Sequence, residues 1–217
     1  MTVTTVANKE RPILFSGEMV RAILEGRKTQ ARRIMKPQPV QVGRVWSWKT
    51  CSWTDTGRIL VGTLDTPLDI CPYGQPGDRL WVKETFSRCG CDGCLSVWPK
   101  FNDHKVRYRE GYGGPSGIVF RPSIFMPRWA SRITLEIVSV RVERVREINE
   151  SDARAEGFEK EFRTVVMRPD GGPNYHIPLS HRGGFVNGWE RRNAKRGYGW
   201  DSNPWVWVIE FKRLEAK

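Results

Sequence analysis

The residues best suited to chemistry lie in one short basic stretch, RKTQARRIM, which begins at Arg27. Its cations crowd into the first seven positions: Arg27, Lys28, Arg32 and Arg33. Cations at this density bind phosphate groups, and a lysine surrounded by other cations has a lowered pKa that suits it to general-base chemistry. The stretch therefore indicates the wall of an anion-binding pocket. A solvated edge of the protein is the alternative interpretation.

A second group of reactive side chains is the cysteine cluster. Cys89, Cys91 and Cys94 have the spacing Cys-x-Cys-x-x-Cys, which can supply three thiolates to Zn²⁺. The fourth ligand stays open among His104, Cys71 and Cys51. No second ligand pair follows at regular spacing, so free reduced thiols are the alternative. A zinc ion here would order its surroundings rather than perform chemistry, and no other cofactor is expected.

The overall charge favours a polyanionic partner. Lys and Arg total 36 against 24 Asp and Glu, a formal net charge of +12. Neutralising phosphates with such cations releases counterions, although a merely basic, soluble surface would look the same in composition. The ten tryptophans supply rings on which bases can stack, but most rings of a domain this size are expected to pack in or around its core.

Composition also bears on the location of the protein. No run of about twenty apolar residues is present, and the start MTVTTVANKERP lacks the apolar centre of a signal peptide. Five cysteines, three of them crowded together, do not resemble a secreted disulfide framework. These features predict a cytoplasmic protein, in the host cytoplasm if a phage encodes it, without a membrane partner.

Local signals predict the elements that must position the basic stretch. Ser16 is the predicted N-cap of a helix through GEMVRAILE that Gly26 ends. The turn residues PYGQPGD lead into a strand at 79–84, where Glu84 is a weaker pocket candidate paired with Arg79 or Lys83.

The second half of the chain shows the longest regular pattern. Apolar residues alternate through 131–148, which predicts one long bent strand or a tight strand pair. Asn149 or Ser151 then caps a short helix, DARAE, that Gly157 stops. Residues 186–195 are predicted to be helical, and the run from Trp205 to Phe211 is predicted to be a closing strand.

These elements predict a single α+β domain over residues 1–217, with strands outnumbering short helices. A chain of this length can bury one core and carry insertions around it. Two stretches with little periodicity, approximately 87–117 and 158–184, are the predicted insertions. We expect a small, closed or nearly closed β-barrel with short flanking helices.

Three sequence segments, taken together, resemble the ASCH domain family in its longer, phage-type form. They are GRKTQARR at 26–33, PGDRLWV at 76–82 and VWVIEF at 206–211, preceded by the short helix. The resemblance implies a PUA-like β-barrel with a cleft beside the helix and the GRKT strand. It further implies that the ligand is RNA, DNA or a modified nucleoside.

Some small ASCH proteins hydrolyse the N4-acyl group of acetylated cytidine, and others are reported as ribonucleases. In the hydrolytic members the pattern is a lysine in GRKT, a threonine three residues later and a glutamate on the short helix after the long strand. The resemblance places Lys28 first and Glu156 third. The second position holds Ala31, which has no hydroxyl to attack a carbonyl, and Thr29 stands about 6.6 Å along the strand from it.

Three hypotheses follow. The first is a binding module for nucleic acid or a modified nucleoside, whose basic cleft is formed by Arg27, Lys28, Thr29, Arg32, Arg33 and Glu84. The second is a hydrolase, an N4-acetylcytidine amidohydrolase or a ribonuclease, with Lys28 as base and Glu156 orienting it. The third is a phage interaction protein that blocks a host nucleic-acid enzyme through its insertions.

Overall fold

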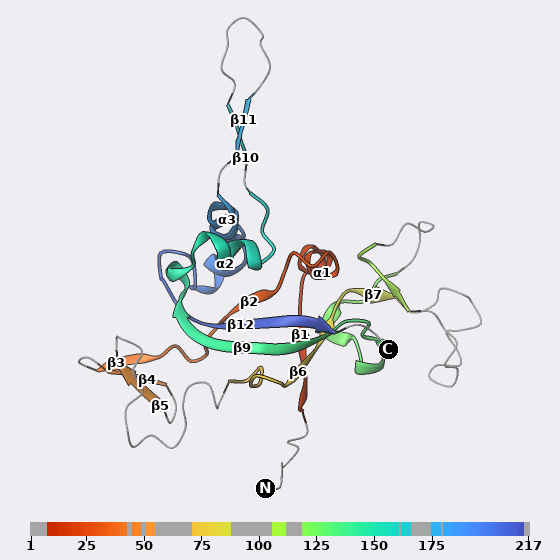
Figure 1. Ribbon diagram of the computed structural model, residues 1–217, viewed down its shortest axis with the longest axis horizontal. Coiled ribbons are helices and arrows are strands. Elements are labelled where there is room, and N and C mark those ends of the chain that lie inside the picture. Colours follow the sequence, from red (N-terminus) through yellow and green to blue (C-terminus); the bar gives the residue numbers. More distant parts are fainter. Residues whose placement is uncertain are drawn as a thin grey trace, which may run out of the picture.

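A five-stranded mixed sheet forms the centre of the protein in the computed structural model (Figure 1). The structure describes residues 8–42, 45–48, 51–54, 71–87, 106–111, 119–160, 162–165, 175–178 and 180–214. The strands, in spatial order, are β1 (Glu10–Leu14), β6 (Arg79–Lys83), β9 (Thr134–Arg144), β12 (Trp205–Leu214) and β2 (Gln30–Ile34). Strand β1 is parallel to β6, and the other neighbours are antiparallel.

Strands β9 and β12 are the longest pair of the sheet. They pair from Trp205 opposite Arg144 to Leu214 opposite Thr134, with a register shift between Glu210 and Phe211. The predicted long strand and closing strand are therefore confirmed. The predicted strand after the PGD turn is confirmed as β6.

The sheet is open, which corrects the prediction of a closed barrel. Among the described residues, β1 and β2 are the two edge strands and no backbone ladder joins them. A side chain bridges them instead, because Nη2 of Arg33 in β2 donates to the carbonyl of Leu14 in β1. The Arg33 guanidinium also lies 4.9 Å from the ring centroid of Phe15. One arginine thus spans the gap that a closed barrel would fill with backbone pairing.

Three α-helices lie beside the sheet. Helix α1 (Gly17–Leu24) begins after Ser16 as predicted, although the Ser16 side chain makes no capping hydrogen bond. Helix α2 (Glu150–Ala155) is capped by Asn149, whose side chain accepts from the amide of Asp152. Helix α3 (His181–Asn193) begins five residues earlier than predicted, because Ser180 caps it by accepting from Gly183 N. No helix among the described residues is long and apolar enough to span a bilayer.

Short elements lie around this frame. The remaining strands form a three-stranded sheet and two hairpins: β3 (Val40–Val42), β4 (Val45–Trp48), β5 (Cys51–Thr54); β7 (Phe86–Ser87), β8 (Arg107–Tyr108); β10 (Phe162–Val165), β11 (Tyr175–Pro178). The 3-10 helices are η2 (Ser123–Phe125), η3 (Arg128–Ala130), η4 (Val145–Glu147) and η5 (Ala194–Arg196). The two hairpins occur where insertions were predicted, and β10–β11 projects away from the sheet beyond α3 (Figure 1). Residues 88–105 and 166–174, within those predicted insertions, lie outside the described residues.

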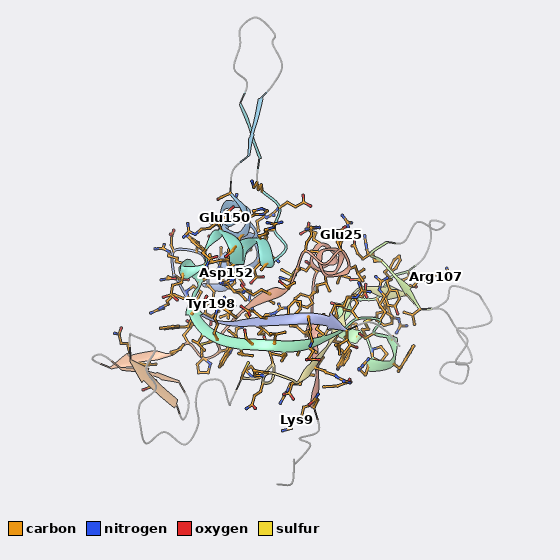
Figure 2. All side chains as sticks on the ribbon, in the orientation of Figure 1. Lys9, Glu25, Arg107, Glu150, Asp152 and Tyr198 are labelled. Atoms are coloured by element: carbon orange, nitrogen blue, oxygen red, sulfur yellow. The ribbon has the colours of Figure 1, made fainter. Side chains whose placement is uncertain are left out.

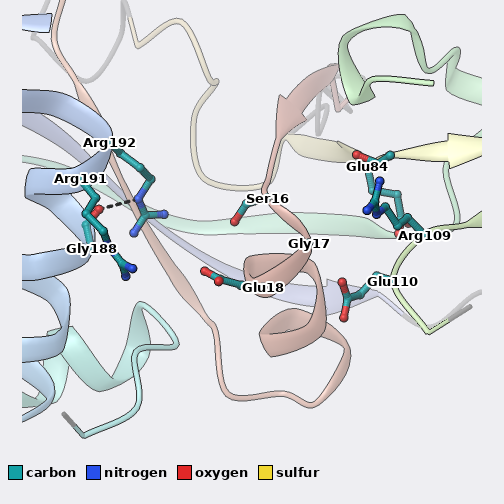
Figure 3. Close-up of a pocket in the computed structure, with 10 residues that line it drawn as sticks. Ser16, Gly17, Glu18, Glu84, Arg109, Glu110, Gly188, Arg191 and Arg192 are labelled. Carbon is teal, nitrogen blue, oxygen red and sulfur yellow. Dashed lines mark hydrogen bonds between the residues drawn. The ribbon is translucent and has the colours of Figure 1, made fainter. Parts of the chain in front are cut away.

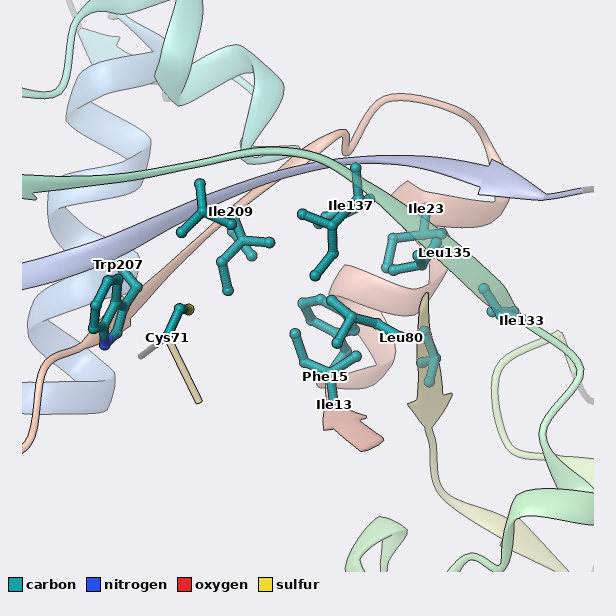
Figure 4. Close-up of a cluster of buried hydrophobic side chains, with 14 of the residues drawn as sticks. Ile13, Phe15, Ile23, Cys71, Leu80, Ile133, Leu135, Ile137, Trp207 and Ile209 are labelled. Atoms are coloured by element: carbon teal, nitrogen blue, oxygen red, sulfur yellow. The ribbon is translucent and has the colours of Figure 1, made fainter. Parts of the chain in front are cut away.

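The core lies on both faces of β12. One face packs against α1 in a cluster that includes Ile23, Leu80, Ile137 and Ile209, all at most 2% exposed (Figure 4). The other face packs Val206 and Val208 against α2 and α3. Apolar side chains are buried on both faces of β12, so this strand is firmly held in the core. The edge strand β2 pairs with it.

The backbone ends α2 at Gly157 in a conformation that favours glycine, with φ of 82°. An added Cβ would lie 2.9 Å from the Cβ atoms of both Ala22 in α1 and Lys28 before β2. Gly157 therefore permits close approach of three segments. It places the end of α2 directly against the start of β2.

We predict that Gly157→Ala lowers the free energy of unfolding by about 2–5 kcal/mol, the sum of a left-handed backbone penalty and overpacking. Gly26→Ala is the matched control, because Gly26 also has a positive φ of 74° but nothing within 4 Å of an added Cβ. That control should lose only about 1–2 kcal/mol. Urea unfolding of both variants checks this, and equal losses would contradict the role given to close packing.

Candidate functional site

Lys28 and Glu156 form a buried ion pair where the end of α2 meets the start of β2. Nζ of Lys28 donates to Oε2 of Glu156 at 2.7 Å, to the Glu156 carbonyl at 2.9 Å and to the Gln30 carbonyl at 2.7 Å. The side chains of Lys28 and Glu156 are 0% and 3% exposed. The structure thus brings together the two residues that the family resemblance singles out.

The three acceptors around Lys28 match the three protons of an ammonium group. Burial lowers the pKa of Lys28 below its ordinary value, and the negative charge of Glu156 opposes that shift. Because every proton of Nζ is directed at a protein oxygen, the group has no donor left for a phosphate. The observed contacts of Lys28 are with Glu156 and Gln30, and its expected anion contact stays a prediction.

Arg32 extends this buried charge network to the helix and the sheet. Its Nη2 donates to Asp152 at 2.9 Å and to Glu143 at 3.1 Å, and Nη1 lies 3.5 Å from Glu156. Asp152 lies between α2 and the sheet (Figure 2). Arg141 also contacts Asp152 and Glu143, so the acidic side chains each serve more than one arginine. Arg32 holds β2 to α2 rather than reaching solvent.

A cavity of about 470 Å³ opens along β2, and we call it the arginine pocket. Five of its described lining residues are cationic, whereas one is a carboxylate, and aromatic rings form much of the remaining wall. The lining residues are Met19, Arg32, Arg33, Ile34, Lys36, Tyr73, Glu156, Phe158, Phe185, Trp189, Arg192, Asn193 and Arg196. Of the residues predicted to form a basic cleft, Arg32 and Arg33 line this pocket, and α3 supplies part of its wall.

Positive charge in the arginine pocket exceeds the negative charge available to balance it. Arg33 and Arg192 make no ion pair with a described residue, and the buried Nε atoms of Arg32 and Arg33 have no hydrogen-bond partner among the described residues. Burial lowers the pKa of Arg192, whereas the negative charges of Glu156 and Glu18 oppose that shift. A guanidinium whose Nε is buried without a hydrogen-bond partner, as in Arg33, is costly, so the pocket favours an anion.

The open edge of β2 adds backbone groups to the pocket wall. Met35 N donates to Trp205 O at 3.0 Å and Phe211 N donates to Thr29 O at 2.8 Å, so odd-numbered residues of β2 bond to β12. In an antiparallel pair, the backbone N–H and C=O groups of the alternate residues point away from the partner strand. The amides and carbonyls of Arg32 and Ile34 therefore face the open edge, along which the pocket lies.

The remaining predicted residues lie outside the arginine pocket. Arg27 is ion-paired with Glu25, and Thr29 is exposed, whereas Ala31 is 2% exposed in the main core cluster. Glu84 is also buried, but Arg132 binds both of its oxygens at 2.9 Å, so the expected pairing with Arg79 or Lys83 is wrong.

Glu84 lines a neighbouring cavity of about 580 Å³ between α1, α3 and the segment at Arg109 (Figure 3). Arg192 lines both cavities.

The proposed zinc ligands cannot be placed. Cys89, Cys91, Cys94 and His104 lie outside the described residues. Cys71, a candidate fourth ligand, is a buried free thiol in the main core cluster, where burial raises its pKa. Within the part of the chain that the structure describes, no three His, Cys, Asp or Glu side chains are grouped to hold a metal.

The residues that sequence reasoning missed are on α3 and η5 and in the loop before β6. Trp189 and Arg192 come from a segment that was predicted helical but given no role, Arg196 follows that segment in η5, and Tyr73 comes from the turn before β6. The basic run ERRNAKR at 190–196 was the available signal. It did not reveal that α3 packs beside β2, some 160 positions away in the chain.

Comparison with protein-family models, with curated proteins and with solved structures finds no match for this chain. The functional interpretation therefore depends on the site itself.

The network around Arg32 predicts a specific acid dependence of stability. Burial tends to raise the pKa of Asp152, but hydrogen bonds from Arg32 and Gln30 hold it below the ordinary value of 3.8. A carboxylate with a lowered pKa stabilises the fold above its ordinary pKa and loses that contribution as pH falls through the lowered pKa. Asp152→Asn should cost about 1–3 kcal/mol at pH 7, and the difference should shrink below about pH 4.

Urea unfolding across the pH range measures this dependence. Asp201→Asn is the matched control, because the Asp201 side chain is 99% exposed in its ion pair with Arg146. A constant difference between native chain and Asp152→Asn at all pH values would contradict the charge-based role of Asp152.

Proposed function

We propose that this chain binds an anionic nucleotide-type ligand, a phosphorylated nucleoside or a segment of nucleic acid, in the arginine pocket. One observation carries the proposal: Arg33 and Arg192 enter a cavity without a described carboxylate paired to either. Arginine binds phosphate through paired N–H donors, and a bound phosphate would supply the missing counter-charge. The free Nε atoms of Arg32 and Arg33 are further donors.

The rest of the pocket suits the nucleoside part of such a ligand. A volume of about 470 Å³ is within the range of small-ligand sites. The partly exposed rings of Tyr73 and Phe158 line the pocket and can contact a base, and the open edge of β2 offers backbone donors and acceptors. In this arrangement the arginines bind the phosphate and position the ligand, and the backbone groups at the edge of β2 form hydrogen bonds with the base.

The ASCH resemblance supports the same ligand class. The open sheet, with a pocket beside α1 and β2, is compatible with a PUA-like fold in which the seam between the edge strands holds the ligand. The net charge of +12 supports an anionic partner independently of any family.

Calorimetric titration with the four ribonucleoside 5′-monophosphates and the four nucleosides tests this function. At least one monophosphate should bind more than about tenfold more tightly than its nucleoside, with affinity falling as salt rises. Arg192→Met should remove that advantage. Arg191→Met is the matched control, because Arg191 is the adjacent, exposed residue of α3 and does not line the arginine pocket. Equal binding of nucleoside and monophosphate, or equal weakening by both variants, would contradict the proposal.

Hydrolysis of N4-acetylcytidine is the second candidate function, and the Lys28–Glu156 contact is the observation that favours it. Such a reaction would need a base to take a proton from water as water adds to the acetyl carbonyl, and to return it to N4 as the C–N bond breaks. The three acceptors already on Nζ and the missing hydroxyl at Ala31 make this arrangement better suited to binding.

Release of cytidine from N4-acetylcytidine distinguishes the two functions. We expect no turnover by the native chain or by Lys28→Met, because Lys28 is saturated with acceptors. Ala31→Thr introduces the hydroxyl that the hydrolytic pattern contains, but Ala31 is buried in the core outside the arginine pocket, so we expect no turnover by this variant either. Turnover by it alone would contradict that expectation and favour the hydrolase. If the native chain releases cytidine and Lys28→Met does not, the binding function is contradicted and the protein is a hydrolase.

A further inference from the structure

A second surface carries aromatic and basic side chains that the arginine pocket does not use. In β6, Leu80 and Val82 are fully buried, so the alternate residues Trp81 and Lys83 face the opposite side of the sheet. Helices η2 and η3 lie beside them, because Nζ of Lys83 donates to the carbonyl of Ile124 in η2. Arg128 of η3 in turn lies over the Trp81 ring, so both helices contact this side of β6.

Two cations are held against the Trp81 ring on this surface. Nζ of Lys83 lies 5.4 Å from the ring centroid, and the Arg128 guanidinium carbon of η3 lies 6.0 Å from it. Glu10 accepts from Arg128 at 2.8 Å and fixes that guanidinium. Lys83 has no ion pair among the described residues, so the local charge stays positive.

Helices η2 and η3 each carry one more aromatic side chain that is largely exposed. Phe125 is 68% exposed and Trp129 is 58% exposed. Ile124 beside them is 60% exposed. Large apolar side chains that are exposed singly are ordinary, but a group of them around fixed cations marks an interaction surface.

We infer that Trp81, Lys83, Phe125, Arg128 and Trp129 form a stacking platform for a single strand of nucleic acid. Unpaired bases stack on aromatic rings, and the phosphates between them neutralise neighbouring cations. A purely apolar partner would bury Lys83 without a counter-charge, which costs free energy. A duplex hides the faces of its bases, so the platform favours a single strand.

The platform is a separate site from the arginine pocket. None of its five residues lines that pocket. The inference therefore does not rest on the proposed nucleotide site, and either can fail without the other.

Fluorescence anisotropy with labelled oligouridine and oligothymidine of about twelve nucleotides tests the platform. Trp129→Ala and Phe125→Ala should each weaken binding of the single strands about fivefold to thirtyfold, as loss of one stacking ring does. Val40→Ala is the matched control, because Val40 is 64% exposed on β3 and is not part of the platform. It should leave the affinity unchanged, and all four proteins should unfold at similar urea concentrations because each substituted side chain is largely exposed.

Several outcomes would overturn the inference. One is that a duplex of the same length binds as tightly as the single strands. Another is that neither Trp129→Ala nor Phe125→Ala changes the affinity for the single strands. A third is that Val40→Ala weakens binding as much as the two ring variants do. Binding of vesicles of anionic lipid that Trp129→Ala abolishes, with no binding of single strands, would assign the surface to a membrane. Concentration-dependent dimers that Trp129→Ala dissociates would assign it to a second copy of the chain. Arg192→Met distinguishes the two sites. In the Arg192→Met background, Trp129→Ala should weaken binding of the single strands by the same factor as in the native chain.

Discussion

The buried charges of Lys28, Arg32 and Glu156 are the interaction on which the arrangement of the site depends. Strand β2 is an edge strand that β12 holds on one side only, and these charges attach its other side to α2. Removing one partner of such a buried pair typically costs about 3–5 kcal/mol, because it leaves an uncompensated charge. Lys28 and Arg32 are paired with carboxylates in this network, whereas Arg33 makes no ion pair with a described residue. The structure thereby separates charges that hold the fold from charges that can bind an anion.

Arg33 has a position that links sheet geometry to the pocket. The sheet curves until its edges β1 and β2 approach, and the guanidinium of Arg33 joins them through the carbonyl of Leu14. The same side chain lines the arginine pocket and has an Nε without a described partner. Closure by a side chain rather than a ladder leaves room for a cavity at the seam. The opening in the sheet and the proposed anion site therefore share one residue, Arg33.

Local signals in the sequence predicted the elements well, and non-local contacts account for what it could not predict. Asn149 and Gly157 bound α2 where capping chemistry requires them, Ser16 precedes α1 without a capping hydrogen bond, and the PGD turn leads into a strand. The open sheet was missed because closure depends on the curvature of five strands together. Four neighbouring cations predicted a basic cleft, but strand alternation puts Arg32 and Arg33 on opposite faces, which gives them different partners. Arg192 could be assigned only once α3 was seen to pack beside β2.

The unpaired side of β2 also bears on the solubility of the protein. An edge strand with free backbone groups is a template for pairing with another chain, and natural proteins protect such edges with charge or with covering segments. Here the arginines of β2 and the side chains of α3 stand along that edge. The groups that form the wall of the arginine pocket thus guard against aggregation as well. Substitutions that make the pocket more apolar would remove that protection together with its positive charge, so solubility and the proposed binding depend on the same residues.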